Sequence, residues 1–304
     1  MVVISHGDVD GIICTSLYLK AKNLSREHMY FTSPAALKDA LCRAMLKREL
    51  KDLFIFDLSG SRQTLRIVSA WERATWIDHH AWRPEERFEN VEVVIKQYPS
   101  AAQVVAEYFG IESELVSVAN EIDTNSAKSD EAIFLRDLIG AIRWRYFRDK
   151  KVLAAKLRAL SSFLACRDFS ELCNEENVKL VEEYRTYLEK SVQTILERVK
   201  IANLNGCKVA VCELTKFLPI YYITNNLLAH EEAPFDVIGI LVHRVSGNGI
   251  TTKVELRSHT GKNVLEIAKE LRGGGHPSAA GATLQEFFGS LQFIERVKRN
   301  LEKL

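Results

Sequence analysis

The sequence lacks the long apolar run that a membrane-spanning helix needs. No uninterrupted apolar stretch approaches the roughly 20 residues that cross a bilayer. The first residues, MVVISHGDVDG, have no basic region ahead of an apolar segment, so we expect no secretory signal peptide. The six cysteines are scattered and form no CxxC pair. We interpret them as reduced thiols and expect a cytoplasmic protein.

The chain also lacks an excess of charge of either sign. Its 41 Lys and Arg against 40 Asp and Glu give a formal net charge of +1. A protein that coats long duplex DNA needs a broad basic face, so this composition argues against that function, although it leaves room for a local basic groove. With 304 residues and a hydrophobic fraction of 47%, the chain is long and apolar enough for one large domain or two ordinary ones.

The order of the apolar segments predicts an α/β protein. Short strands are expected at 2–5, 51–60, 74–80 and 91–95, with segments long enough for helices between them. This alternation, with continuous apolar runs such as LFIF, is typical of a parallel sheet covered by helices on both faces. Beyond about residue 99 the apolar spacing becomes helical. Strand patterns return at 207–214, 235–245 and 250–258.

We therefore predict two domains of different size. The first is a parallel-sheet domain flanked by helices over 1–190, with a helical portion at 99–190. A helical linker follows over 191–206. A smaller mixed α/β domain is expected over 207–304.

Ionisable side chains gather where three predicted strands end. They are His6, Asp8 and Asp10 after the first strand, Asp57 after the second, and Asp78, His79 and His80 at the third. Each acid alone is common in a turn or at a helix N-cap. In open α/β sheets, however, ligands bind outside the carboxyl ends of the strands, so three such clusters together indicate a functional site.

Such a dense group of carboxylates calls for a cation, because neighbouring acids repel one another and raise each other's pKa. Mixed His and Asp ligands suit manganese, magnesium, zinc or iron. The acids are too many for one ion, and two ions about 3.5–4 Å apart are a common device for hydrolysing phosphate esters. One ion activates a water, and both neutralise charge on the phosphoryl oxygens.

Four stretches together, SHGDVDG, FDLSG, IDHH and GGGHPSAAGA, resemble the DHH phosphoesterase family and its associated C-terminal domain. The resemblance covers residues 1–123 and roughly 250–285. It implies hydrolysis of phosphodiesters or phosphomonoesters with two divalent ions, usually Mn²⁺, with Mg²⁺ as the alternative, bound between two domains.

The resemblance also implies roles for single residues. The implied metal ligands are His6 and Asp8 for the first ion, Asp10 and His79 for the second, Asp57 as the bridge between them, and Asp123 as the fourth-motif acid in ANEIDTN. Asp130 and Asp137 are rival acids that look like solvated helix positions. The implied catalytic residues are His80, which matches a histidine facing the substrate phosphate, and Asp78, which would orient a histidine from behind.

The glycine run in LRGGGHPSAAGA forms a second candidate site. Alone, three glycines are typical of a flexible surface loop, but they also let backbone N–H groups approach an anion closely. The small residues of SAAGA suit tight packing beneath such a loop. The resemblance implies that substrate is bound by Arg257, Ser258, Gly273, Gly274, Gly275 and His276.

The resemblance, taken with the compact two-domain length, implies a 3′–5′ exonuclease that acts on single-stranded RNA or DNA and releases nucleoside monophosphates. The near-neutral charge favours short substrates held at few points. The alternative enzymes are a 3′-phosphoadenosine-5′-phosphate phosphatase and a cyclic-dinucleotide phosphodiesterase. From another class, the alternative is a non-catalytic nucleic-acid-binding module. The stretch RWRYFR, 143–148, is typical of a solvated helix face, though its aromatic and basic residues could also contact single strands.

Overall fold

The computed structural model describes residues 1–24, 28–47, 49–216, 218–247 and 249–302. The chain divides into two units, Met1–Arg185 and Thr186–Leu304, and each is described by itself. Within the described ranges, no helix is both long and apolar enough to cross a bilayer.

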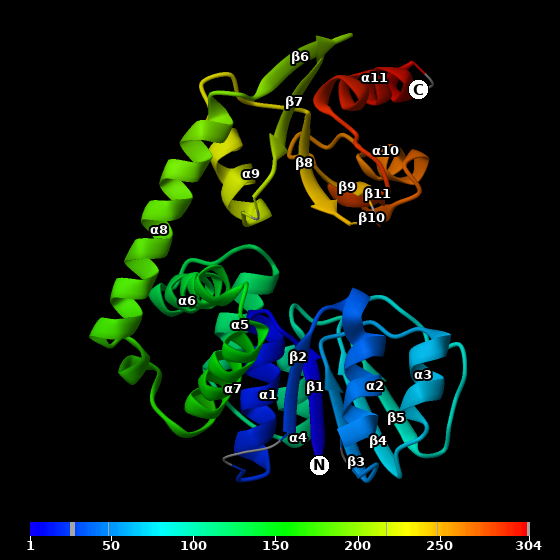
Figure 1. Ribbon diagram of the computed structural model, residues 1–304, viewed down its shortest axis with the longest axis vertical. Coiled ribbons are helices and arrows are strands. Elements are labelled where there is room, and N and C mark those ends of the chain that lie inside the picture. Colours follow the sequence, from blue (N-terminus) through cyan, green and yellow to red (C-terminus); the bar gives the residue numbers. More distant parts are fainter. Residues whose placement is uncertain (25–27, 48, 217, 248, 303–304) are drawn as a thin grey trace. The chain divides into compact units, whose positions relative to one another are not determined.

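Five short strands pair in parallel to form the sheet of the first unit (Figure 1). They are β1 (Val2–His6), β2 (His28–Thr32), β3 (Asp52–Phe56), β4 (Arg73–Asp78) and β5 (Val91–Ile95). Their order in the sheet is β2-β1-β3-β4-β5. The order reverses direction at β1, so the crevice at the carboxyl ends of β1 and β3 is the position where this kind of sheet binds ligands.

Helices cover both faces of this sheet, as the continuous apolar strands require. They are α1 (Val9–Ala21), α2 (Leu37–Lys47), α3 (Arg62–Val68), α4 (Ala101–Phe109), α5 (Leu115–Asp123), α6 (Asp130–Tyr146) and α7 (Lys150–Cys166), with short 3₁₀ turns η1 (Pro34–Ala36) and η2 (Phe169–Leu172). Alternate strand residues point to opposite faces. Val3 and Phe56 pack in the core that includes α1 and α4–α7, whereas Ile4 and Ile55 pack in the core that includes α2 and α3.

The second unit contains a six-stranded mixed sheet of order β10-β11-β9-β8-β7-β6. Its elements are β6 (Lys200–Leu204), β7 (Cys207–Leu214), α9 (Ile220–Leu228), β8 (Val237–Ser246), β9 (Gly249–Arg257), α10 (Leu265–Glu270), β10 (Gly274–His276), β11 (Ala279–Leu284) and α11 (Ser290–Leu301). Only the β7–β8 pair is parallel among the described pairs. Helices α10 and α11 contribute to one apolar core with the strands. The α/β class with a parallel first sheet and a mixed second sheet is confirmed.

Several local expectations are wrong. The edge strands β2 and β6 were not expected, because their sequences, HMYFT and KIANL, are only partly buried and lack a continuous apolar run. The long helix expected within 171–203 is α8 (Glu175–Leu196). The helical linker predicted at 191–206 is therefore helical only in its first part, since β6 begins at Lys200. Residues 303 and 304 of the predicted second domain lie outside the described residues.

Candidate active site

The three polar clusters expected from the sequence meet at the carboxyl edge of the first sheet. Ligand atoms lie within 4.8 Å of one another in three overlapping groups, which are His6, Asp8 and Asp57; Asp10, His79 and Asp123; and Asp57, Asp78, His79 and His80. Asp57 belongs to two of these groups. All eight predicted ligand and catalytic residues are thus gathered in one place. His79 also belongs to two groups, so Asp57 and His79 together connect the cluster.

The turn between β1 and α1 arranges the first group. Asp8 is the N-cap of α1 and accepts a hydrogen bond from the Gly11 amide at 3.2 Å, while its other oxygen lies 2.6 Å from His6 Nδ1. A Cβ at Gly11 would stand 2.2 Å from the His6 carbonyl oxygen. Only glycine permits this close approach of α1 to the end of β1, which brings both acids of the Asp-x-Asp pair to the sheet edge.

A distant helix holds Asp10. The backbone amides of Ala101 and Ala102, at the N-terminus of α4, donate to its two carboxylate oxygens at 2.7 and 2.8 Å. The free N–H groups and the dipole of a helix N-terminus favour a negative charge, so α4 stabilises this buried anion and fixes its orientation. The sequence signal is Ser100, which caps α4 by accepting the Gln103 amide.

Asp57 has the backbone geometry of a functional residue. Its φ is 56°, a left-handed conformation that is uncommon for a residue other than glycine. The residue is 2% exposed, and its Oδ2 atom has no hydrogen-bond partner among the described residues. A strained residue with an unsatisfied buried oxygen is typical of a site completed by a ligand.

The DHH tripeptide is held by hydrogen bonds from behind. Asp78 is completely buried and accepts bonds from the His79 amide at 2.9 Å and from the Trp82 indole at 2.7 Å; its Oδ1 also lies 2.8 Å from His80 Nδ1. Asp78 is therefore saturated by protein groups, as the predicted orienting role requires. The His80 ring is about half exposed, which leaves its other nitrogen accessible.

The tautomer of His79 follows from its partner. Its Nδ1 lies 3.0 Å from the Tyr98 carbonyl oxygen, which only accepts, so Nδ1 carries the proton. In the neutral ring, Nε2 then presents a lone pair. Nε2 lies 3.3 Å from Asp123 and 3.9 Å from Asp10, and it is buried without a hydrogen-bond partner among the described residues. A buried imidazole nitrogen with a free lone pair is well suited to coordinate a metal ion.

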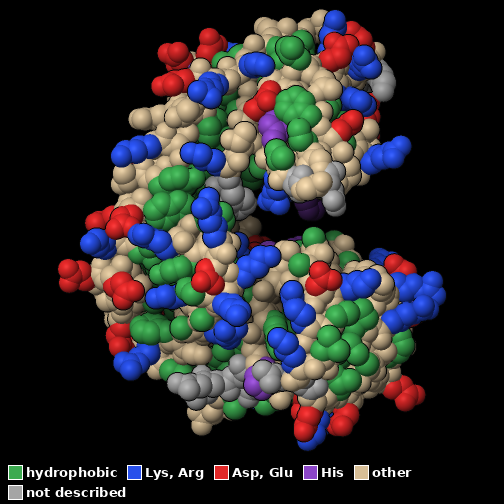
Figure 2. Space-filling view, viewed as in Figure 1, with side chains coloured by type: hydrophobic (Ala, Val, Ile, Leu, Met, Phe, Trp, Pro, Cys, Tyr) green, Lys and Arg blue, Asp and Glu red, His purple; other side chains and the backbone are tan. Residues whose placement is uncertain are grey.

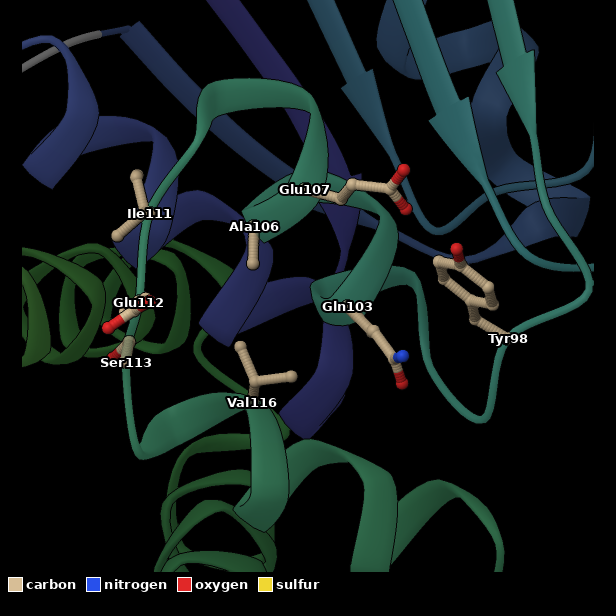
Figure 3. A pocket seen from close by; sticks show the side chains of 8 residues that line it. All are labelled: Tyr98, Gln103, Ala106, Glu107, Ile111, Glu112, Ser113 and Val116. Carbon is tan, nitrogen blue, oxygen red and sulfur yellow. The ribbon is translucent and has the colours of Figure 1, made fainter.

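A shallow cavity of about 440 Å³ opens beside Tyr98 between the segments of α4 and α5 (Figure 3). Glu107 and Glu112 both contribute to its lining. Two acids make this cavity a poor site for a phosphate, so the metal cluster, rather than this cavity, is the candidate active site.

The carboxylates of the cluster destabilise one another's charge. Burial, followed by the charges of Asp123 and Asp8, raises the pKa of Asp10 well above its ordinary value. Burial and the charges of Asp10 and Asp8 do the same to the pKa of Asp57, and burial raises the pKa of Asp123.

Two acids behave in the opposite way. Burial would raise the pKa of Asp8, but the hydrogen bond and charge of His6 lower it overall. Burial would likewise raise the pKa of Asp78, but hydrogen bonds from His80 and Trp82 lower it. The Asp78 hydrogen bond in turn raises the pKa of His80.

The residues fit a pair of divalent ions. Their donors are carboxylate oxygens and imidazole nitrogens, the set used by manganese and related ions. Two buried ligand atoms, on Asp57 and His79, lack hydrogen-bond partners among the residues that the structure describes. Positive charge would relieve the repulsion between the acids. One group contains His6 and Asp8, another contains Asp10, His79 and Asp123, and Asp57 lies between them.

Comparisons with known proteins agree with this geometry. The model of the DHHA1 domain matches residues 222–304, the region that follows the DHH cluster in the chain. Residues 222–304 therefore belong to the DHHA1 domain family. That the whole chain is a DHH phosphoesterase, with a metal site at the His and Asp cluster, stays a prediction.

Several solved structures share the fold over nearly the whole chain. The pGpG-specific phosphodiesterase PggH from Vibrio cholerae is 19% identical with a TM-score of 0.60, covering 99% of this chain and 97% of that one. RecJ from Thermus thermophilus in complex with Mn²⁺ is 16% identical with a TM-score of 0.59, covering 99% and 52%. An exonuclease RecJ bound to manganese is 17% identical with a TM-score of 0.55, covering 99% and 90%. The sequence has no match among curated proteins.

The second predicted site lies in the DHHA1 domain. The run GGGHPSAAGA was expected to be a loop, but it forms the hairpin β10–β11 at the sheet edge. Glycine weakens the sequence signal for a strand, yet a Cβ at Gly273 would stand 2.0 Å from the Gly281 carbonyl. Gly273, Gly275 and Gly281 are thus needed for close backbone packing, whereas a Cβ at Gly274 would meet open space.

The hairpin leaves side chains near the end of β9 available for a ligand. His276 is exposed, and Gly274 and Gly275 are exposed with it. Arg257 pairs with Ala279 across the strands and contacts Glu255 at 3.3 Å. Next to it, the hydroxyl of Ser258 is buried without a hydrogen-bond partner among the described residues. Their role in binding substrate stays a prediction.

Two interpretations of charged residues are wrong. Asp137 was expected to be solvated, but it is 5% exposed and pairs with Arg136 at 3.2 Å and Arg185 at 2.7 Å. Arg143, the first residue of RWRYFR, was treated as part of a solvated helix face. Its guanidinium instead donates to the Gly7 carbonyl, and burial lowers its pKa. The one-dimensional pattern of α6 could not reveal either partner.

Proposed function

We propose that this chain is a DHH phosphoesterase and, within that family, a two-metal 3′–5′ exonuclease that hydrolyses short single-stranded RNA or DNA and releases nucleoside monophosphates. The observation that carries the proposal is the sharing of Asp57 between two groups of ligand atoms. A pair of bound ions would supply positive charge to the phosphoryl oxygens and an activated water as the attacking group. Manganese is the proposed metal, and its presence in the RecJ structures of similar fold supports this choice.

The protein residues would position the reacting groups. His79 and the acids would hold the ions, with α4 fixing Asp10 and Tyr98 fixing His79. His80, oriented by Asp78 and accessible on its outer side, would contact the substrate phosphate. In the DHHA1 domain, we propose that Arg257, Ser258, Gly273, Gly274, Gly275 and His276 bind the rest of the substrate. An Arg fork and free backbone N–H groups both suit a phosphate.

Short substrates are favoured by the surface as well as by the net charge. Figure 2 shows Lys and Arg side chains scattered over the visible face and interrupted by Asp and Glu, rather than gathered in one broad basic band. The fold shared with PggH, described as pGpG-specific, supports including dinucleotides among the substrates. A cyclic-dinucleotide phosphodiesterase and a 3′-phosphoadenosine-5′-phosphate phosphatase are the competing activities within the same chemistry.

The test is a Mn²⁺-supplemented digestion of 5′-labelled RNA and DNA, from dinucleotides to long oligomers, beside a nucleoside 3′,5′-bisphosphate and a cyclic dinucleotide. We expect a descending ladder that is strongest for short oligomers, is abolished by EDTA and returns with Mn²⁺. Phosphate release from the bisphosphate without a ladder would assign the protein to small-nucleotide turnover. Oligomer binding without any hydrolysis would instead favour a nucleic-acid-binding module.

A further inference from the structure

Arg143 joins helix α6 to the turn that carries the first metal ligands. Its Nη2 donates a hydrogen bond to the carbonyl oxygen of Gly7. Gly7 stands between His6 and Asp8, and no residue separates it from either proposed ligand. The contact spans 136 positions in the chain.

The Gly7 peptide is held on both sides. Its N–H donates to the Thr32 carbonyl at 3.0 Å, at the end of β2, while its C=O accepts from Arg143. A Cβ at Gly7 would stand 3.0 Å from Nη2. Glycine therefore leaves the space through which the guanidinium reaches the backbone.

We propose that Arg143 is a positioning residue of the metal centre, fixing the Gly7 carbonyl so that His6 and Asp8 converge on one ion beside Asp57. This inference rests on the proposed function, because it requires the cluster to bind two ions. Residues behind metal ligands commonly change metal affinity about 10–100-fold when they are removed.

Because Arg143 is positively charged, the direction in which its replacement changes metal affinity distinguishes two possible roles. A cation close to Asp8 repels a divalent ion, so deleting the charge alone would tighten metal binding. Deleting an anchor of the ligand turn would weaken it. The two roles thus predict opposite changes in the dissociation constant.

The experiment titrates the metal-free protein with Mn²⁺ by calorimetry and needs no enzymatic assay. We expect two ions to bind to the wild type, and Arg143→Met to weaken one of them about 10–100-fold while the other changes little. Only one ion is affected because Arg143 contacts the turn of His6 and Asp8, whereas Asp10 and His79 are held by α4 and Tyr98. Arg143→Lys, which keeps a donor, should recover most of the lost affinity.

The same helix offers a matched control. Arg145 forms an ion pair with Glu183 and has a side chain that is 44% exposed, so Arg145→Met removes one arginine from α6 without touching Gly7. We expect this variant to bind both ions as the wild type does. Circular dichroism in EDTA should show folded protein for every variant.

A double-mutant cycle separates anchoring from general loosening. Gly7→Ala should displace the guanidinium slightly from the carbonyl while keeping its charge, and weaken the binding of the same ion by up to about tenfold. Once Arg143→Met is present, adding Gly7→Ala should cost much less. This cycle also serves if Arg143→Met alone folds poorly, because Gly7→Ala can then be paired with Arg143→Lys.

Four results would overturn the positioning role. Arg143→Met could bind metal as tightly as the wild type or more tightly, or it could weaken both ions equally. Arg145→Met could show a comparable loss, or the losses in the cycle could be fully additive. A wild-type protein that binds fewer than two ions would contradict the proposed function itself. The two failures are therefore distinguishable in one set of titrations.

Discussion

The two candidate sites of this chain are built in different ways. In the N-terminal unit, the central acids Asp10, Asp57 and Asp78 are at most 2% exposed, and a helix far along the chain holds Asp10. In the DHHA1 domain, exposed backbone and His276 form a short hairpin at a sheet edge. The first site is a desolvated set of charges that needs cations, and the second is an open surface suited to a ligand.

This difference has a chemical meaning. Buried carboxylates with raised pKa values interact strongly with a metal ion, because little water screens the charges. Exposed groups grip a substrate more weakly but let it enter and leave. We therefore expect changes in the first site to act on turnover and metal content, and changes in the second to act on substrate affinity or on folding of the hairpin.

The largest expected effect comes from Asp57→Ala. One carboxylate belongs to two ligand groups, so its loss should lower kcat by about a thousandfold or more. Metal analysis should show fewer than two bound ions, while Arg145→Met, which lies outside the cluster, should keep full activity. Near-normal turnover by Asp57→Ala would remove Asp57 from the site.

The next effect concerns the hairpin. Gly273→Ala would place a Cβ 2.0 Å from the Gly281 carbonyl, whereas Gly274→Ala would meet nothing within 4 Å. We expect the first to lower the free energy of unfolding by about 2–3 kcal/mol and the second to change it by less than about 0.5 kcal/mol. Denaturant unfolding measures both, and equal effects would contradict the described packing.

The metal-free protein should lose stability as pH rises from 4 to 8. The pKa values of Asp10, Asp57 and Asp123 are raised above the ordinary 3.8 by burial, and that of His80 is raised above 6.5 by its bond to Asp78. A group with a raised pKa in the folded state contributes stability below its ordinary pKa and loses it as pH rises through the folded value.

Asp8 and Asp78, with lowered pKa values, act in the opposite sense only below about pH 4. Thermal unfolding in EDTA across this pH range tests the prediction, and Asp57→Asn should flatten the slope. Mn²⁺ should restore stability at high pH. A metal-free protein that gains stability with rising pH would show that ionisation of the buried carboxylates does not destabilise the folded state.

The smallest effect is expected for His276→Ala. His276 is an exposed residue of β10, so its loss should raise KM for short oligomers about tenfold, the value of one charge-assisted hydrogen bond. The content of bound metal should not change. Lost metal, or an unchanged KM with lowered kcat, would move this histidine out of the substrate-binding surface.

The sequence predicted the strands that carry chemistry better than those that do not. β1, β3 and β4 contain short apolar stretches that lead directly into acids or histidines, so their pattern and their predicted function coincide. The edge strands β2 and β6 lack that pattern. The hairpin β10–β11 was missed because its glycines, which read as a loop, serve the close approach of backbones that only the folded sheet reveals.

The ligands themselves could be predicted, but their supports could not. Asp57 and His79 stand in short motifs, whereas Ala101, Tyr98 and Arg143 act through backbone atoms or over long separations. The sequence does not distinguish the backbone amide of Ala101 from that of any other alanine. Such contacts depend on which helix end reaches the sheet edge, and that is decided by the fold.

The hydrogen bonds from the N-terminus of α4 to Asp10 also determine when in folding the metal site can be completed. The two partners are 91 and 92 positions apart, so a growing chain that has presented its first acids still lacks the amides that hold one of them. Until α4 has docked, Asp10 is a carboxylate without its anchor, and an ion that arrives early meets only part of its site. Binding of both proposed ions would therefore require the sheet and α4 to be folded, so only correctly folded protein would bind the full number of ions.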